Sequence, residues 1–161
     1  MLVCAECGKP KSPSGSPFCP SCASTWESKA FTVRQEFDSS GLPKTNVLAS
    51  SLSLQLSGAG KDGWEPCDVV GDTGEITVIL KRSRETPPSK MDYVVISFQM
   101  RNDAPRAYRN GVEIHELPGS GVSYNGYFQW YKSRGWLYHN FQVPTPNPSY
   151  NDLMCIFARR V

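Results

Sequence analysis

Four of the six cysteines stand in two pairs with the same spacing. Cys4 and Cys7 form the first pair, Cys19 and Cys22 form the second, and eleven residues separate the pairs. A two-residue gap lets one tight turn aim both sulfurs at the same ion, and four thiolates complete a tetrahedron. Because such a set leaves no position for a bound water, the spacing predicts one structural zinc ion. An iron site, a redox dithiol and chance spacing are the alternatives.

The segment between the pairs consists mostly of residues that form turns. Phe18 is its only large apolar residue, so this segment cannot build a core of its own, and the metal must supply the folding energy. Gly8 follows the first pair, where a residue without Cβ fits a tight turn most easily. Residues 1–26 are therefore predicted to form a zinc ribbon. Cys67 and Cys155 lie in apolar, strand-like runs and are interpreted as small buried hydrophobic residues.

The chain offers little for catalysis. His115 and His139 are the two histidines, and no motif places either of them beside a nucleophile or a paired carboxylate. Nothing in the spacing favours a site made of Cys67, Asp68 and His139. The glycine-rich stretch 119–126 lacks the Lys-Ser/Thr ending of a phosphate loop. We expect a protein that is not an enzyme.

An unusually dense aromatic stretch lies near the end of the sequence. Its members are Tyr124, Tyr127, Phe128, Trp130, Tyr131, Trp136 and Tyr138. A helix packed on a sheet hides only about one face, so part of this set is expected on the surface as a contact site for a protein or for stacked bases. The candidate contact residues on this helix are Tyr127, Trp130, Tyr131, Lys132 and Arg134.

A second candidate contact region is basic. Lys81, Arg82 and Arg84 lead into a segment that contains Pro87 and Pro88, which cannot enter a central strand. The cations could touch phosphate, or they could be a solvated connection and no more. Residues 85–91 are interpreted as a linker between two units.

The first unit is predicted over residues 30–84. A strand over 31–37 is followed by a helix that opens after Pro43 and closes in the Gly58–Gly63 region. Trp64 comes next, and then a hairpin over 67–80. The serines of this helix lower its intrinsic propensity, so packing must hold it.

The second unit is predicted over residues 92–161. It has a strand over 93–98, a helix from Ser123 to about Arg134, the dipeptide Gly135-Trp136, and two further strands over 137–143 and 153–157. The first unit ends in the basic pair Lys81-Arg82 and the second in Arg159-Arg160. The order strand, helix, Gly-Trp, strand, strand, basic pair thus occurs twice and predicts a duplication. We expect an α+β fold in which a zinc ribbon precedes duplicated β-α-β-β units. These units would form one antiparallel sheet with two helices packed on one face, and both tryptophans of the Gly-Trp pairs would lie in the core.

The residues 61–65, Lys-Asp-Gly-Trp-Glu, and the later run Val-Ile-Leu-Lys-Arg that ends at Arg82 resemble a family of short bacterial and phage domains of unknown function. That family reads strand, helix, Gly-Trp-Glu-Leu, hairpin. The resemblance covers about residues 31–82 and departs at Pro66, and the second unit keeps only its Gly-Trp pair. The family is often joined to zinc ribbons, and the resemblance implies no activity.

Charge and hydropathy restrict the function further. The net charge of +2 is too small to indicate a protein that coats duplex nucleic acid, and no run approaches the roughly 20 apolar residues that span a membrane. Paired cysteines bound to metal fit a reducing cytoplasm. We expect a non-catalytic zinc-binding interaction or assembly factor that docks on a larger protein complex, with no small-molecule substrate evident. The alternative is an accessory protein that binds single-stranded nucleic acid through the basic linker and the aromatic helix.

Overall fold

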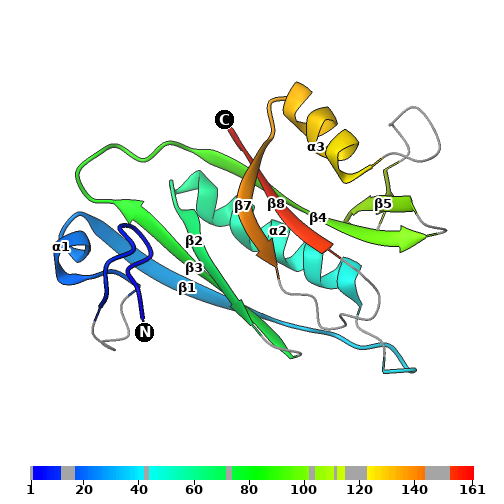
Figure 1. Ribbon diagram of the computed structural model, residues 1–161, viewed down its shortest axis with the longest axis horizontal. Coiled ribbons are helices and arrows are strands. Elements are labelled where there is room, and N and C mark those ends of the chain that lie inside the picture. Colours follow the sequence, from blue (N-terminus) through cyan, green and yellow to red (C-terminus); the bar gives the residue numbers. More distant parts are fainter. Residues whose placement is uncertain are drawn as a thin grey trace.

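The computed structural model describes residues 2–11, 17–41, 44–71, 74–101, 104–110, 112–114, 123–143 and 153–161. It has the expected α+β class, with three helices and eight strands in the described part (Figure 1). The helices are α1 (Pro20–Ala23), α2 (Thr45–Lys61) and α3 (Tyr124–Ser133). The strands are β1 (Trp26–Arg34), β2 (Glu65–Gly71), β3 (Glu75–Ser83), β4 (Met91–Arg101), β5 (Ala104–Arg109), β6 (Val112–Glu113), β7 (Leu137–Val143) and β8 (Leu153–Arg160).

The strands form two antiparallel sheets, so the expectation of one sheet is wrong. One sheet has the order β1-β3-β2, and the other has the order β6-β5-β4-β8-β7. β2 and β7 contact each other as the facing edges of the two sheets. Pro66 has no N–H to offer across this junction, and both edge strands shift register, after Pro66 in β2 and after His139 in β7. Proline and irregular pairing both keep a strand edge from joining a ladder.

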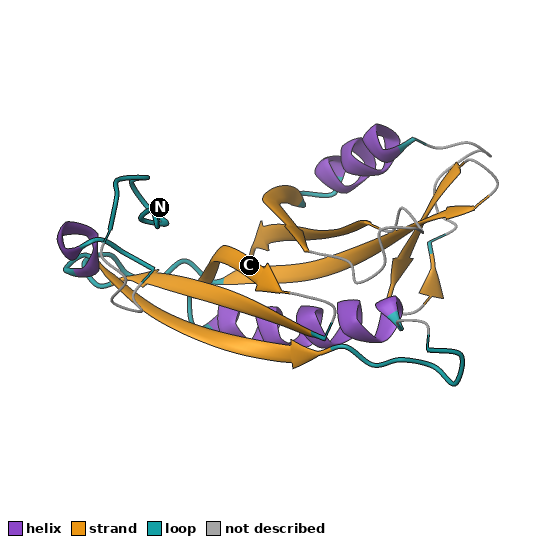
Figure 2. Cartoon of the chain, turned by 60° about the horizontal axis from the view of Figure 1, so that its bottom comes forward, coloured by secondary structure: helices purple, strands orange, loops and turns teal. Residues whose placement is uncertain are grey.

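The two long helices cover opposite faces of the five-stranded sheet, so the expectation that both lie on one face is also wrong. Tyr93 and Val95 of β4 belong to the core around α2, whereas Val94 and Ile96 belong to the core around α3. Figure 2 shows the long helix below this sheet and the shorter helix above it. Since successive side chains of a strand point to opposite faces, a strand that is apolar at every position needs cover on both.

Helix α2 packs against both sheets. Its buried leucines pack against β3 of the smaller sheet and against β4 and β8 of the larger one. Among the described strands, β8 is the one that pairs with the part of β4 before Ser97, and α2 covers the other edge. There the hydroxyl of Ser53 accepts a hydrogen bond from the Val95 N–H at 2.7 Å, and the hydroxyl of Ser57 donates to the Tyr93 carbonyl at 2.7 Å. The serines that weaken this helix in isolation therefore satisfy backbone groups of a strand edge.

Both long helices end in the same way. Gly63 and Gly135 have φ angles of 75° and 79°, in the left-handed region that closes helices. The next residue, Trp64 or Trp136, donates its N–H to the carbonyl five residues earlier, at 3.1 and 3.0 Å. The tryptophan side chains are only 8% and 5% exposed, so their predicted place in the core is confirmed.

Candidate metal centre

The sulfur atoms of Cys4, Cys7, Cys19 and Cys22 lie close together, all within 4.8 Å of one another. The Sγ atoms of Cys7 and Cys19 are 3.7 Å apart. Sulfurs at about 2.3 Å from a tetrahedral ion are separated by about 3.8 Å, so this pair already has the spacing of two ligands on one ion. The four side chains form a group that can hold a metal ion.

Short-range backbone contacts hold each pair in position. In the first turn, the Gly8 N–H donates to the Cys4 carbonyl at 3.0 Å, and Gly8 has a φ of 68°, which explains the glycine after the second cysteine. In the second turn, Cys19 precedes α1 and Pro20 occupies its first position, where a missing N–H costs nothing. The Cys22 N–H donates to the Cys19 carbonyl at 3.0 Å.

The thiols differ in acidity because they share one small space. For Cys4, burial works against the charged form, but hydrogen bonds from the backbone of Cys7, Cys19 and Glu6 outweigh it and lower the pKa to about 6. Hydrogen bonding to the backbone of Cys22 lowers the pKa of Cys19. Burial, together with the neighbouring cysteines, raises the pKa of Cys22 to about 12. Several thiolates this close repel one another, and a bound cation removes that repulsion.

The ribbon is packed against the smaller sheet. Phe18 is buried with Cys4 and Cys19, and Trp26 and Cys67 pack against this cluster. Lys81 of β3 forms an ion pair with Glu6 of the ribbon and lies 4.3 Å from the centre of the Trp26 ring. The metal group therefore has a fixed position on the body, at the end of the smaller sheet (Figure 1).

The structure changes the interpretation of the aromatic helix. Tyr127 and Tyr131 are buried, and they pack on Phe98 and Phe157 of the larger sheet. Their predicted role as contact residues is therefore wrong. They lie four positions apart, on the helix face that packs against the sheet. Trp130 is half-buried, and the Arg134 guanidinium covers its ring at 3.8 Å. Lys132 and Arg134 are exposed.

The basic residues before the linker are engaged within the molecule. Lys81 is held by the ribbon, as described above. The Arg82 Nε donates to a Glu27 carboxylate oxygen at 2.8 Å, and its guanidinium lies 4.5 Å from the centre of the Trp64 ring. Arg84 is exposed. Lys81 thus connects the first unit to the ribbon, and Arg82 connects β3 to β1.

His139 is half-buried, and its ring lies edge-on to Tyr93 with the centroids 6.2 Å apart. Burial, and then the charge of Lys81, lowers its pKa, which favours the neutral imidazole. Cys67 shares a small cavity with His139, but burial raises the pKa of this thiol to about 11, unlike that of an activated nucleophile. Cys155 is buried as expected. His115 lies outside the described residues.

Within the described ranges, no second group of three or more metal-binding side chains comes together, and no helix is long and apolar enough to cross a membrane. A cavity of about 690 Å³ lies where the two sheets meet, and it is lined in part by Glu65, Arg160 and Trp26. Reasoning from the sequence used Glu65 and Arg160 only as parts of the repeated pattern and did not assign these three residues to a common site, because nothing in their spacing brings them together.

Comparison of the chain with protein-family models, with curated proteins and with solved structures finds no match. The resemblance carried by the Gly-Trp motif therefore stays a prediction.

Proposed function

We propose that the four clustered cysteines bind one structural zinc ion, and that the chain is a non-catalytic interaction or assembly factor that docks on a larger protein complex. The observation that carries the proposal is the closed set of four sulfurs on two tight turns. All four donors are thiols, which suit zinc, and the set leaves no coordination position for a substrate. All six cysteines are free thiols, and this fits a reducing compartment such as the cytoplasm.

The ribbon itself supports a role in docking. Leu2 and Val3 stand directly before the first ligand, and each is 54% exposed. A short bridge between Val3 and Pro10 holds this segment against the first turn. Neighbouring apolar side chains on a rigid, metal-held turn can anchor a partner at a small entropic cost. We assign the first contact with the partner to Leu2 and Val3.

The contacts of the basic residues favour a protein partner over a single nucleic acid strand. Lys81 and Arg82 are already paired with carboxylates, and a strand would have to displace Glu6 and Glu27 to reach them. Arg134 covers the Trp130 ring, which leaves less of it for a stacked base.

We also propose that the two halves are copies of one unit, with the β5–β6 pair as an insertion in the second copy. Support comes from the strand order, since β1-β3-β2 and β4-β8-β7 place the last strand in the middle. The registers agree as well. In both units, the middle-strand residue that pairs with the start of the first outer strand lies two positions after the one that pairs with the start of the second outer strand. The pairs are Trp26 with Ser83 and Glu65 with Lys81, and Met91 with Arg160 and Leu137 with Ala158.

Metal analysis of the purified, unchelated chain tests the first part of the proposal. We expect one zinc ion per chain by native mass spectrometry and elemental analysis. Cys19→Ser should lose the ion, whereas the matched control Cys67→Ser should keep it, because Cys67 packs beside the ligands without joining them. Iron in place of zinc, or a metal-free wild-type chain, would contradict the zinc assignment.

Affinity purification from the native host tests the second part. The wild-type chain should recover a defined set of proteins in fixed stoichiometry, and Leu2→Glu with Val3→Glu should lose that set while keeping its zinc. Leu54→Glu is the control, since Leu54 is 75% exposed on α2, away from the ribbon. If the ribbon variant and the control recover the same proteins as the wild type, the docking role of the ribbon is wrong.

A further inference from the structure

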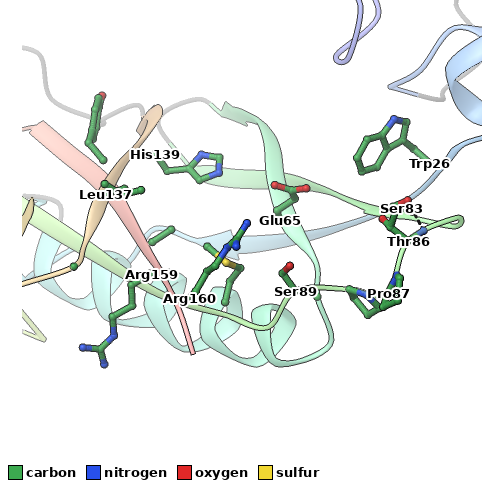
Figure 3. Close-up of a pocket in the computed structure, with 16 residues that line it drawn as sticks. Trp26, Glu65, Ser83, Thr86, Pro87, Ser89, Leu137, His139, Arg159 and Arg160 are labelled. Atoms are coloured by element: carbon green, nitrogen blue, oxygen red, sulfur yellow. Dashed lines mark hydrogen bonds between the residues drawn. The ribbon is translucent and has the colours of Figure 1, made fainter.

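The cavity at the junction of the two sheets has the features of a ligand site. It measures about 690 Å³, within the range of cavities that hold small molecules. Its walls come from the starts of β2 and β7, the ends of β3 and β8, and the segment 86–89 (Figure 3). Both units therefore contribute to one space.

Equivalent positions of the two units line this cavity in pairs. Gly63 and Gly135 both lie in its wall, as do the strand starts Trp26 and Met91. The residues paired with these starts, Ser83 and Arg160, also line it. The chemistry is not symmetric, however. The first unit supplies Trp26, Ser83 and Glu65 at three positions where the second unit supplies Met91, Arg160 and Leu137.

This asymmetry places the Glu65 carboxylate and the Arg160 guanidinium around the same space, which Arg159 lines as well. Glu65 and Arg160 both line the cavity, yet no ion pair joins them. The neighbouring Arg159 is engaged elsewhere, because it pairs with Asp92 at 3.2 Å and lies over the Trp136 ring. Figure 3 shows the Arg160 side chain directed into the space below Glu65 and His139, and Arg159 directed away from it.

The rest of the lining has polar members, such as Ser83, Ser89 and His139, and a somewhat larger apolar part. Trp26, Met91 and Leu137 contribute apolar surface from three different strands, and Pro87 and Pro88 add a stiff wall from the linker. Lys81 lies over the Trp26 ring at 4.3 Å, which helps to hold the indole in place. An apolar body with two opposite charges at its polar end would match this surface.

We propose that this cavity binds a small zwitterion, namely a free α-amino acid with a large apolar side chain. The ligand carboxylate pairs with the Arg160 guanidinium, which offers a planar fork of donors, and the ligand ammonium pairs with the Glu65 carboxylate. The side chain of the ligand lies against Trp26, Met91 and Leu137. This site is separate from the metal centre, because none of the four clustered cysteines lines it, although Trp26 also packs against the cluster around Cys4 and Cys19.

Calorimetric titration of the purified full chain with L-tryptophan, L-methionine and L-leucine tests the proposal. We expect saturable, one-to-one binding of at least one of them below about 10 mM. Two relatives of tryptophan isolate the charges, since tryptamine lacks the carboxylate and indole-3-propionate lacks the ammonium. Each should bind at least about tenfold more weakly than tryptophan.

Two variants connect the charges of the ligand to the two residues. Arg160→Gln should weaken the binding of the amino acid at least about tenfold and leave that of tryptamine unchanged. Glu65→Gln should weaken the binding of the amino acid similarly and leave that of indole-3-propionate unchanged. Arg34→Gln, on the exposed end of β1, is the control and should bind as the wild type does. The proposal is overturned if no amino acid saturates, if either single-charge relative binds as tightly as tryptophan, or if the variants do not separate the two charges.

Discussion

The two β-α-β-β units share a strand order but differ in how their sheets are covered. In the first unit, Ile76, Val78 and Leu80 of β3 are buried against α2, while Thr77 and Ile79 between them are only half-buried. In the second unit, every residue of β8 from Met154 to Ala158 is buried, because α2 covers one face and α3 covers the other. The same topology thus gives a two-layer arrangement in one half and a three-layer arrangement in the other.

One helix, α2, covers a face of both sheets. α2 belongs to the first unit by sequence, yet its core includes Tyr93 and Val95 of β4 and Met154 and Ile156 of β8. The core around α3 consists of residues of the second unit. The first unit instead receives the ribbon, which packs at one end of its sheet. We therefore expect the body to unfold as one cooperative unit and the ribbon to behave separately.

Removal of the metal should have the largest effect, and it should be confined to the ribbon. A ribbon with so few apolar residues depends on ion binding, which contributes about 10–16 kcal/mol in comparable small sites. After treatment with a strong chelator, residues 2–11 and 17–23 should lose protection from hydrogen exchange, while β4 and β8 keep theirs. Loss of protection throughout β4 and β8 would show that the body is not independent of the ribbon.

Leu52→Ala should destabilise both units together. Leu52 is fully buried in the core that α2 shares with both sheets, so the substitution should lower the free energy of unfolding by about 2–5 kcal/mol. Denaturant unfolding should show a single transition at a lower midpoint. The exposed Leu54→Ala should change the free energy by less than about 0.5 kcal/mol. Two separate transitions in the Leu52 variant would contradict a shared core.

The glycines that end the two helices offer a matched pair. Both have positive φ angles, so alanine should cost about 1–2 kcal/mol at either position. At Gly63 a Cβ would also overlap the ring of Pro88, whereas at Gly135 it would meet nothing within 4 Å. Thermal unfolding should therefore show a clearly lower midpoint for Gly63→Ala than for Gly135→Ala. Equal midpoints would mean that the linker does not pack on the first helix end.

Ser53→Ala should lower the free energy of unfolding by about 1–3 kcal/mol. It removes the acceptor of the Val95 N–H and leaves that buried donor without a partner. Ser50→Ala is the control, because the Ser50 hydroxyl donates only to the Asn46 carbonyl of its own helix. Hydrogen exchange at Val95 should accelerate in the first variant alone. Unchanged exchange there would remove the serine from its assigned role.

The sequence predicted local features better than it predicted how elements meet. The sulfur cluster, the Ser123 helix cap and the buried tryptophans follow from short spacings, and each of them is present. The faces of α2 and α3 were assigned wrongly, although the unbroken apolar run 93–96 carried a signal for burial on both faces. The cavity could not be predicted, because Glu65 and Arg160 meet only through the packing of two sheets.

The role of α2 between the sheets also has a consequence for synthesis of the chain. Leu52 is made before any of the residues that cover it from β8, and Met154 and Ile156 follow it by roughly 100 residues. At a synthesis rate of about 5–20 residues per second, β8 is made about 5–20 s after this helix, and the apolar face of the helix lacks its contacts with β8 during that time. Ser53 and Ser57 make the side of the helix that later meets β4 partly polar. A nascent chain that stalls before β8 would therefore expose the apolar face of α2, the kind of surface that chaperones bind.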